Sequence, residues 1–346
     1  MKKLLSVCLT TCVLVFSSAS VQAKGDQIQL RDGHPEEYVV VKGDTLWDIS
    51  GRFLKKPWRW PEIWDVNKQI DDPHWIYPGD VLYLTWVDGK PKLRKKGNDR
   101  LQPRARVSKI ESAIPAIPLK DLHSFLSDNA VLDDELLKTT PYVVGGRNER
   151  IIAGAGDRIY ARGELDTSVK TQNIYRPAKE YVDKDTGELL GYEMHKVAET
   201  RVISTKEDVI SLDVLKTREE VRVLDRVLPS PEGRVQSVFN PAPAPEFSEG
   251  YIMSVLRGVN KIGRFDAVAI NQGYREGVQA GHVYKIFKRG ESLKDPITKE
   301  TIELPSEEAG TLMVFKAYER VSYGLVMTAT NVMSVGDKVR SPDAQE

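Results

Sequence analysis

Cysteine is nearly absent from this sequence. The 346 residues include only Cys8 and Cys12, and both lie in the apolar run at the start of the chain. Everything after that run therefore lacks the thiols needed for disulfides, for a thiol nucleophile and for thiolate metal sites. Net charge is absent too, because 50 basic residues balance 50 acidic ones. This balance argues against nucleic acid as a partner.

Long hydrophobic runs are also missing, apart from residues 4–16. That run follows two lysines and leads into small residues that end at Ala23, which is the layout of a secretory signal. It is shorter than the roughly 20 residues that span a bilayer. We therefore expect residues 1–23 to be a signal peptide removed after Ala23, leaving an exported protein without a transmembrane segment. An uncleaved anchor is the alternative.

Motifs of hydrolytic enzymes are absent as well. The histidines have no zinc-site spacing, and neither Ser-x-x-Lys nor Gly-x-Ser-x-Gly occurs. Gly154-Ala155-Gly156 lacks the third glycine of a phosphate loop and precedes Asp157, which would repel phosphate, so we expect a turn there. The sequence thus predicts no catalytic residue, no metal ligand and no cofactor. The expected protein is not an enzyme.

An abrupt change from strand to helix occurs near Gly43. The β-branched residues 39–41 predict a strand, and Gly43 supplies a permissive backbone for the break. Thr45 stands three residues before Asp48, which is a capping-box spacing. Apolar residues follow at helical intervals, namely Leu46, Ile49 and Phe53. We therefore expect a strand that runs directly into a capped helix.

A second helix and a closing strand follow. Pro61 and Glu62 indicate a helix start, and Ile63, Val66 and Ile70 lie on one face of that helix. The sequence Tyr77-Pro78-Gly79-Asp80 is typical of a type II turn. Residues 81–87 predict the last strand. The whole segment is expected to form a β-α-α-β unit.

Two blocks of this unit resemble the signature of the LysM family, whose members bind polymers containing N-acetylglucosamine, chiefly peptidoglycan in bacteria. The blocks are Val41-Lys42-Gly43-Asp44-Thr45-Leu46-Trp47 and Ile76-Tyr77-Pro78-Gly79-Asp80-Val81-Leu82. In that family the glycan lies in a shallow groove between the first strand–helix loop and the loop before the last strand. The resemblance implies one wall of Gly43, Asp44, Thr45 and Leu46, and a second wall of Ile76, Tyr77, Pro78 and Gly79, with Trp75 beside it.

All six tryptophans lie within this unit, namely Trp47, Trp58, Trp60, Trp64, Trp75 and Trp86. An indole suits the apolar face of a sugar ring, but a small domain without disulfides also needs bulky residues in its core. The helical positions of Trp47 and Trp64 favour the core. Trp58, Trp60 and Trp75 stand in loop-like contexts near proline, where either role fits.

The segment after the unit is strongly basic. Residues 88–110 contain nine lysines or arginines and two aspartates, a local balance of +7 (9 − 2). Such a run is usually a solvated linker. It also offers an electrostatic contact for anionic wall polymer, lipid headgroups or an acidic partner. We expect residues 88–118 to be a basic, proline-containing linker, with either role open.

The rest of the chain contains an internal repeat. Segments that begin at Ile174 and Ile286 resemble each other and continue to Asp225 and Asp337, with an offset of 112 residues at both ends (286 − 174 and 337 − 225). A Pro-Ala run before the second copy predicts a semi-rigid linker. We expect β-rich modules with a helix or two at residues 119–230 and 247–342, a linker at 231–246, and a helix at residues 119–137.

The expected fold class is therefore α+β with several domains, a LysM module at residues 36–87 followed by two β-rich repeat modules. A signal, one LysM unit, a basic connector and two FlgT-like β-rich repeats resemble the architecture of the type IV pilus secretin-associated (TsaP) family of Gram-negative bacteria. That resemblance implies a periplasmic protein that holds peptidoglycan and contacts the outer-membrane secretin, with a ring-like homo-oligomer as an option. The alternatives are a general wall-bound scaffold, a regulator of murein hydrolases and a flagellar collar component.

Overall fold

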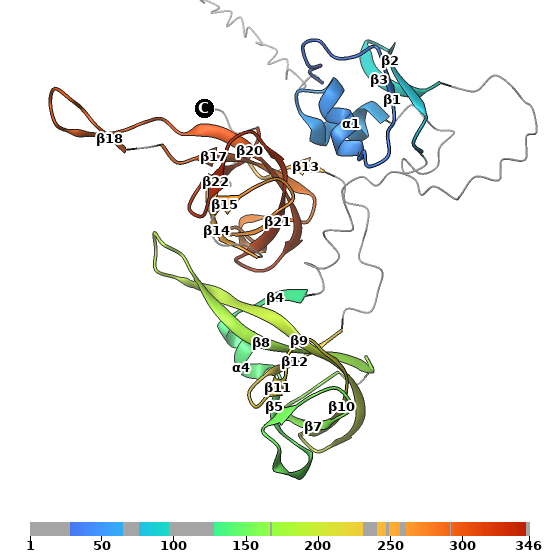
Figure 1. Cartoon of the computed structure of the whole chain (residues 1–346), viewed down its shortest axis with the longest axis vertical. Coiled ribbons are helices and arrows are strands. Elements are labelled where there is room, and N and C mark those ends of the chain that lie inside the picture. The colour runs from blue at the N-terminus through green and yellow to red at the C-terminus, as the bar shows by residue number, and fades with distance from the viewer. Residues whose placement is uncertain are drawn as a thin grey trace, which may run out of the picture.

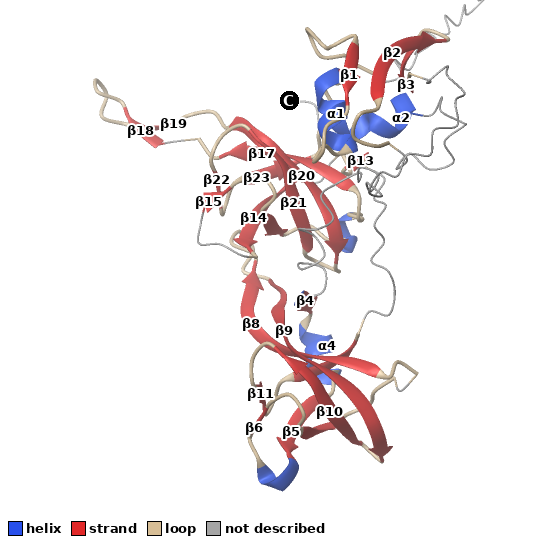
Figure 2. Ribbon diagram, turned by 45° about the vertical axis from the view of Figure 1, so that its right-hand side comes forward, coloured by secondary structure: helices blue, strands red, loops and turns tan. Residues whose placement is uncertain are grey.

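The computed structural model describes residues 28–64, 76–96, 128–166, 168–230, 241–246, 249–256, 261–290 and 292–343. They form a small N-terminal module and two β-rich bodies (Figure 1). The expected signal peptide, Trp75 and most of the basic connector lie outside these residues. Strands dominate the described part, so the fold is mostly β rather than an even mixture of helix and strand (Figure 2). Among the described residues, no helix is both long and apolar enough to cross a bilayer.

The N-terminal module has a three-stranded antiparallel sheet in the order β1-β2-β3, with short helices packed against it. Its elements are β1 (Glu37–Val39), α1 (Leu46–Phe53), η1 (Pro57–Arg59), α2 (Trp60–Trp64), β2 (Val81–Val87) and β3 (Lys90–Lys95). The Thr45 hydroxyl accepts a hydrogen bond from the Asp48 N–H at 3.1 Å, which confirms the predicted cap of α1. The range predicted for the closing strand is confirmed by β2. Residues 65–75, including the predicted end of the second helix, lie outside the described residues.

Two boundaries of this module differ from the sequence prediction. The first strand ends at Val39, because the Val41 N–H donates to the Asp44 carboxylate at 2.9 Å instead of joining the sheet. Strand β3 lies where the sequence predicted a linker from residue 88, so that linker boundary is wrong. Leu93 is the reason, because it is fully buried in the core within an otherwise basic strand.

The first β-rich body is a closed barrel. Six strands of its seven-stranded sheet form a ring in the order β10-β7-β5-β12-β8-β9 and back to β10, while the seventh, β4, pairs with β9. Apolar residues such as Ile159, Ile174 and Leu212 fill its interior. The elements are β4 (Asn129–Leu132), α4 (Asp134–Thr139), β5 (Tyr142–Gly146), η2 (Arg147–Glu149), β6 (Ile152–Ala153), β7 (Arg158–Arg162), β8 (Thr171–Val182), β9 (Leu189–Lys206), β10 (Val209–Thr217), β11 (Val221–Arg222) and β12 (Arg226–Pro229).

The second β-rich body is also a closed barrel. Six strands of its seven-stranded sheet form a ring in the order β17-β20-β21-β16-β14-β23 and back to β17, and the seventh, β13, adds to β17 in parallel. Its interior contains Ile252, Val268 and Leu312. The elements are β13 (Ala242–Pro243), β14 (Glu249–Val255), β15 (Lys261–Ile262), β16 (Ala267–Ile270), η3 (Tyr274–Glu276), β17 (His282–Lys288), β18 (Ser292–Lys294), β19 (Thr301–Glu303), β20 (Glu307–Ala317), β21 (Ser322–Ala329), β22 (Met333–Ser334) and β23 (Lys338–Arg340).

The two barrels have the same connectivity. The ring strands β5, β7, β10, β9, β8 and β12 correspond in order to β14, β16, β21, β20, β17 and β23, and the small ladder of β6 with β11 corresponds to that of β15 with β22. A buried aspartate fixes the same turn in each barrel. The Asp225 carboxylate accepts the Arg222 N–H, and the Asp337 carboxylate accepts the Ser334 N–H, both at 2.8 Å. The repeated aspartate is thus a turn residue.

Two further sequence boundaries differ from the structure. The helix predicted at residues 119–137 is contradicted at Asn129–Leu132, which form β4; helix α4 begins after it, with Asp133 as its cap. The reason is burial, because Val131 and Leu132 both pack into apolar clusters from this strand. Residues 119–127 lie outside the described residues. In the predicted linker at 231–246, Ala242–Pro243 form β13, because their backbone adds to the edge of β17.

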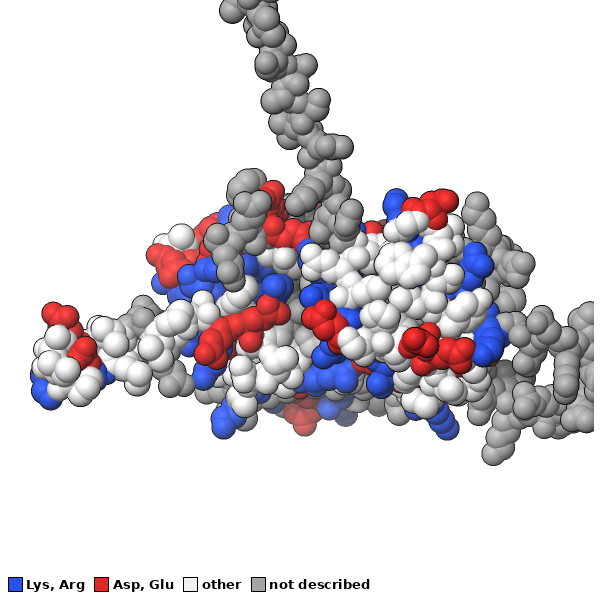
Figure 3. Space-filling model, turned by 90° about the horizontal axis from the view of Figure 1, so that it is seen from above, with Lys and Arg blue, Asp and Glu red and all other residues white. Residues whose placement is uncertain are grey.

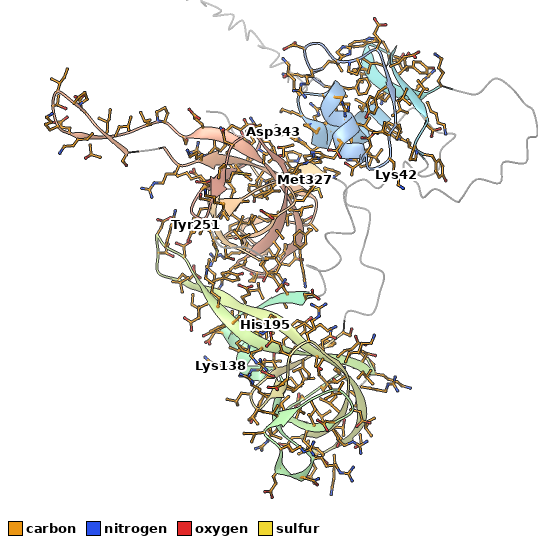
Figure 4. The ribbon with its side chains drawn as sticks, viewed as in Figure 1. Lys42, Lys138, His195, Tyr251, Met327 and Asp343 are labelled. Atoms are coloured by element: carbon orange, nitrogen blue, oxygen red, sulfur yellow. The ribbon has the colours of Figure 1, made fainter. Side chains whose placement is uncertain are left out.

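The second barrel carries an apolar outer face, which we define as Tyr251, Met253, Ala267, Ala269, Val321, Tyr323, Leu325 and Met327. Trp47 and Trp58 of the N-terminal module belong to the same apolar cluster, and so do Val131, Tyr181 and Leu190 of the first barrel. Figure 4 places Met327 toward the N-terminal module and Tyr251 toward the first barrel. The outer face therefore joins the second barrel to both of its neighbours.

Candidate functional site

The first predicted wall lies where β1 turns into α1. Gly43 is exposed and has a φ of 99°, a conformation that favours glycine. The Asp44 carboxylate is buried and accepts the Tyr38 hydroxyl at 2.9 Å. The Thr45 hydroxyl caps α1, and the Leu46 side chain is 1% exposed. Gly43 thus offers surface to a ligand, while the next three residues hold the loop in shape.

The second predicted wall is the type II turn, which the structure confirms. The Asp80 N–H donates to the Tyr77 carbonyl at 3.0 Å, and Gly79 has a φ of 94°. The Tyr77 N–H in turn donates to the Asp80 carboxylate at 2.9 Å. Tyr77 is 39% exposed, and Pro78 and Gly79 also reach the surface, whereas Ile76 is completely buried. Contact from Ile76 or Leu46 to a ligand would therefore have to come from the backbone.

Val40 brings the two walls together. Its N–H donates to the Asp80 carbonyl and its carbonyl accepts the Gly79 N–H, both at 2.8 Å. These paired bonds place the loop of Gly43 beside the turn of Gly79. The solvent-accessible part of the predicted site is therefore a strip formed by Gly43, Tyr77, Pro78 and Gly79, and Trp75 lies outside the described residues.

Two residues at this site were missed from the sequence. Lys95 places its ammonium 2.7 Å from the Asp80 carboxylate and 6.0 Å from the centre of the Tyr77 ring. Burial, together with the hydrogen bond to Asp44, raises the pKa of Tyr38. Tyr38 precedes the buried Val40 by two residues, a strand spacing that could have placed both on one face. Lys95 offered no such signal, because it stands among many lysines.

The four buried tryptophans of the described residues divide into two groups. Trp60 and Trp64 belong to the core of the N-terminal module, whereas Trp47 and Trp58 belong to the cluster shared with the second barrel. The expectation that Trp47 and Trp64 are core residues is confirmed. Trp58 and Trp60, which were undecided, are also buried. Trp86 alone among the described tryptophans is largely exposed, at 62%.

Ion pairs flank the contact between the N-terminal module and the second barrel. The Lys56 ammonium lies 2.7 Å from the Asp343 carboxylate, and Arg264 pairs with Asp48 of α1. Arg264 also donates to the Met327 carbonyl at 3.0 Å. Asp48 is the residue that the Thr45 hydroxyl contacts at 2.7 Å, so the barrel touches the helix that begins at the first wall.

Within the described ranges, no group of three metal-ligating side chains gathers that could hold a metal ion. The predicted turn after Gly154 is confirmed, since the Asp157 carboxylate accepts the Gly154 N–H at 2.9 Å and faces the loop where a phosphate would lie. The surface around Gly43 and Gly79 is open to solvent.

Comparison with known proteins identifies this module. Residues 38–85 match the model of the LysM domain family. The uncharacterized protein YqbP of Bacillus subtilis (strain 168) is 45% identical over 60 residues, which cover 14% of this chain and 27% of that protein. The chain thus spans about a quarter of the length of this curated relative. A LysM domain implies binding of peptidoglycan or a related carbohydrate, and it is a binding domain rather than a catalytic one. Residues 38–85 of this chain are a LysM domain.

Proposed function

We propose that this chain is a non-catalytic periplasmic protein that binds peptidoglycan through its LysM domain and anchors an envelope assembly, the outer-membrane secretin of a type IV pilus, to the cell wall. The observation that supports peptidoglycan binding is the LysM domain, with its accessible strip of Gly43, Tyr77, Pro78 and Gly79. The glycan would lie along this strip, between the loop after β1 and the turn before β2. The proposal that the chain anchors the secretin rests on the resemblance in architecture to the type IV pilus secretin-associated family.

The way the LysM domain is attached supports an anchoring role. Trp47 and Trp58 lie against the second barrel, so one side of the LysM domain is covered while the strip of Gly43 and Tyr77 keeps exposed residues. A single shallow site should bind weakly, because a short glycan buries little area and association loses translational freedom. Several copies in a ring, or a second contact on the same chain, would raise retention through effective concentration.

The test of peptidoglycan binding is co-sedimentation of the full mature chain with purified peptidoglycan. Tyr77→Ala removes the exposed ring of the second wall and should weaken binding at least fivefold with unchanged circular dichroism. Trp86→Ala is the matched control, because Trp86 is an exposed aromatic residue at the opposite end of β2 from that turn. Equal binding by both variants and the parent would place the glycan elsewhere on the domain.

The test of the anchoring role is binding to the purified secretin of the source bacterium. The full mature chain should bind the secretin in detergent, and the Tyr77→Ala variant should bind it equally well. Absence of binding by the parent chain would overturn the anchoring role and leave the carbohydrate-binding role intact.

A further inference from the structure

A free hairpin of the second barrel corresponds to the hairpin by which the first barrel docks. Strands β8 and β9 are joined by a tip at residues 183–188 that reaches the second barrel. Strands β18 and β19 form the equivalent tip at residues 295–300, which extends the hairpin of β17 and β20. The offset between the tips is 112 residues (295 − 183), the same as the sequence repeat.

The two tips are built in the same way. The Asp183 carboxylate accepts the Thr186 N–H at 2.9 Å, and the Asp295 carboxylate accepts the Thr298 N–H at 3.0 Å. Each aspartate N–H also donates, at 2.8 Å, to the carbonyl of the glutamate that ends the tip. The residue before each glutamate has a positive φ, 73° in the first tip and 63° in the second. The hairpins thus present equivalent positions in equivalent geometry.

The first tip shows which groups such a hairpin can contact. The second oxygen of Asp183 accepts the Asn271 amide at 2.9 Å, and Glu188 lies 2.8 Å from Arg275 and 3.3 Å from Arg320. The backbone also takes part, because the Lys184 N–H donates to the Tyr251 hydroxyl at 2.6 Å.

The apolar part of the same contact comes from the strand ends. Tyr181 and Leu190 enter the apolar outer face and are 1% and 3% exposed. The receiving surface is therefore an apolar sheet face bordered by two arginines and an amide donor.

The second tip has the carboxylates and apolar side chains of this set without their partners, and it lacks the backbone donor, because Pro296 stands at the position of Lys184. Leu293 and Ile302 stand at the positions of Tyr181 and Leu190, pair across the strands, and are 48% and 45% exposed. Ile297 at the apex is 88% exposed. The structure shows no hydrogen bond or ion pair from residues 293–302 to the rest of the described chain. Figures 1 and 3 show this hairpin projecting from the barrel.

We propose that the tip at residues 293–302 is a docking element for a second protein, which offers an apolar sheet face bordered by arginine and amide donors. Leu293, Ile297 and Ile302 would be buried on that face, while Asp295 and Glu300 would pair with its donors. This inference rests on the proposed anchoring function, because it assigns the contact surface for the anchored secretin.

A second copy of this chain is a poorer occupant. The apolar outer face of the second barrel already holds Tyr181 and Leu190. The equivalent face of the first barrel is polar, because Arg158 pairs with Asp213 and Arg162 pairs with Asp208 across it. Burying Leu293 and Ile302 on these ion pairs would cost desolvation without apolar gain.

A lipid surface is also disfavoured. The tip carries Lys294 and Lys299, but Asp295 and Glu300 balance them. An anionic membrane would therefore attract the hairpin little, and its carboxylates would have to leave water.

The test uses the full mature chain and the purified secretin in detergent. The double substitution Leu293→Ser with Ile302→Ser should weaken binding at least tenfold, and Glu300→Arg should weaken it as well. The matched control is Ile151→Ser with Val332→Ser, which changes two residues that are 72% and 60% exposed on other loops. This control should bind within twofold of the parent, with circular dichroism and peptidoglycan retention unchanged in all variants.

Other outcomes separate the inference from the proposed function. Parent binding with no loss in the tip variants overturns the docking role of the hairpin alone. No binding by the parent overturns both. If the parent chain self-associates in sedimentation and the tip variant does not, the occupant of the tip is a second copy of this chain. If the parent chain floats with vesicles of phosphatidylethanolamine and phosphatidylglycerol and the tip variant does not, the occupant of the tip is a lipid surface. Either result overturns the proposed partner.

Discussion

Asp183 shows how one residue links the two barrels. Burial alone would raise the pKa of its carboxyl, but hydrogen bonds from the Asn271 amide and from the N–H groups of Thr186 and Asp185 outweigh it and lower the pKa to about 2. Since the folded pKa lies below the ordinary value of 3.8, the stabilisation is present above that value and is lost as the pH falls toward 2. The link between the barrels is therefore sensitive to acid.

We expect Asp183→Asn to reveal this contribution. The difference in unfolding free energy between the parent and this variant should shrink by about 2 kcal/mol between pH 6 and pH 2, measured by urea titration. Asp295→Asn is the matched control, because Asp295 forms the same turn without an Asn271 partner. An equal pH dependence for the two variants would contradict a role for the contact between barrels.

Lys316 on β20 links stability to pH in the alkaline range. Burial lowers the pKa of its ammonium from 10.5 to about 8, and its nitrogen lies 5.0 Å from the centre of the Tyr318 ring. The unfolded chain binds more protons between these two values, so stability should rise with pH above about 8. The gain from pH 8 to pH 9.5 should be at most about 2 kcal/mol.

Lys316→Met should abolish this rise, as measured by urea unfolding at both pH values. Lys294→Met changes an exposed lysine of the same barrel and should keep the rise. If Lys316→Met kept it too, the rise would belong to another group.

At the scale of elements, local chemistry made some features predictable. The cap at Thr45, the turn at Gly79 and the strand β2 depend on residues a few positions apart, and all three are confirmed. Strand β3 was missed because its basic composition is typical of solvated linkers, whereas its place in the sheet depends on a single buried leucine. Strand β4 was predicted as a helix because its pairing partner is distant in the sequence. Leu132 of β4 pairs with Tyr192 of β9, 60 residues later (192 − 132).

The strand β3 leads to a prediction about the LysM domain. Leu93→Ala should destabilise the domain by about 2–4 kcal/mol, because it leaves a cavity in a fully buried position. Arg94→Ala alters the neighbouring, partly exposed side chain and should change stability by less than about 0.5 kcal/mol. Thermal unfolding followed by tryptophan fluorescence measures both, since every tryptophan of the chain lies in this module. A similar small effect of both substitutions would mean that β3 does not contribute to the core.

At the scale of the whole molecule, sequence analysis predicted that the two β-rich modules pack on each other, but neither the closure of the barrels nor the residues that join the modules. The pair of Arg264 with Asp48 joins residues 216 positions apart, and no local pattern indicates it. The two barrels also share connectivity but differ on their outer faces. Ala267 and Leu325 of the second barrel face outward where the first barrel has the pair of Arg158 and Asp213. This difference explains why only the second barrel packs against both neighbours among the described parts.

The candidate site was predictable from the sequence only in part. The motif blocks located the loop at Gly43 and the turn at Gly79, since glycine and proline reveal turns directly. They did not reveal that Leu46 and Ile76 are buried, because burial depends on how the sheet and helices close around them.

The packing of the LysM domain on the second barrel leads to the last prediction. Met327 lies on the apolar outer face, in the cluster that contains Trp47 and Trp58, and is fully buried. Met327→Asp would place an unpaired charge in that contact, at a cost of about 3–5 kcal/mol if it stayed buried. Separation of the domain from the barrel avoids this cost, because it returns the carboxylate to water. The separated domain would expose Trp47 and Trp58, so tryptophan emission should shift to longer wavelength while circular dichroism stays the same. Val332→Asp, at a position that is 60% exposed on the same barrel, should cause no shift.

Co-sedimentation with peptidoglycan should persist in both variants, because the strip of Gly43 and Tyr77 does not include Met327. An unshifted emission spectrum for a folded Met327→Asp variant would show that the domain is not held through this face.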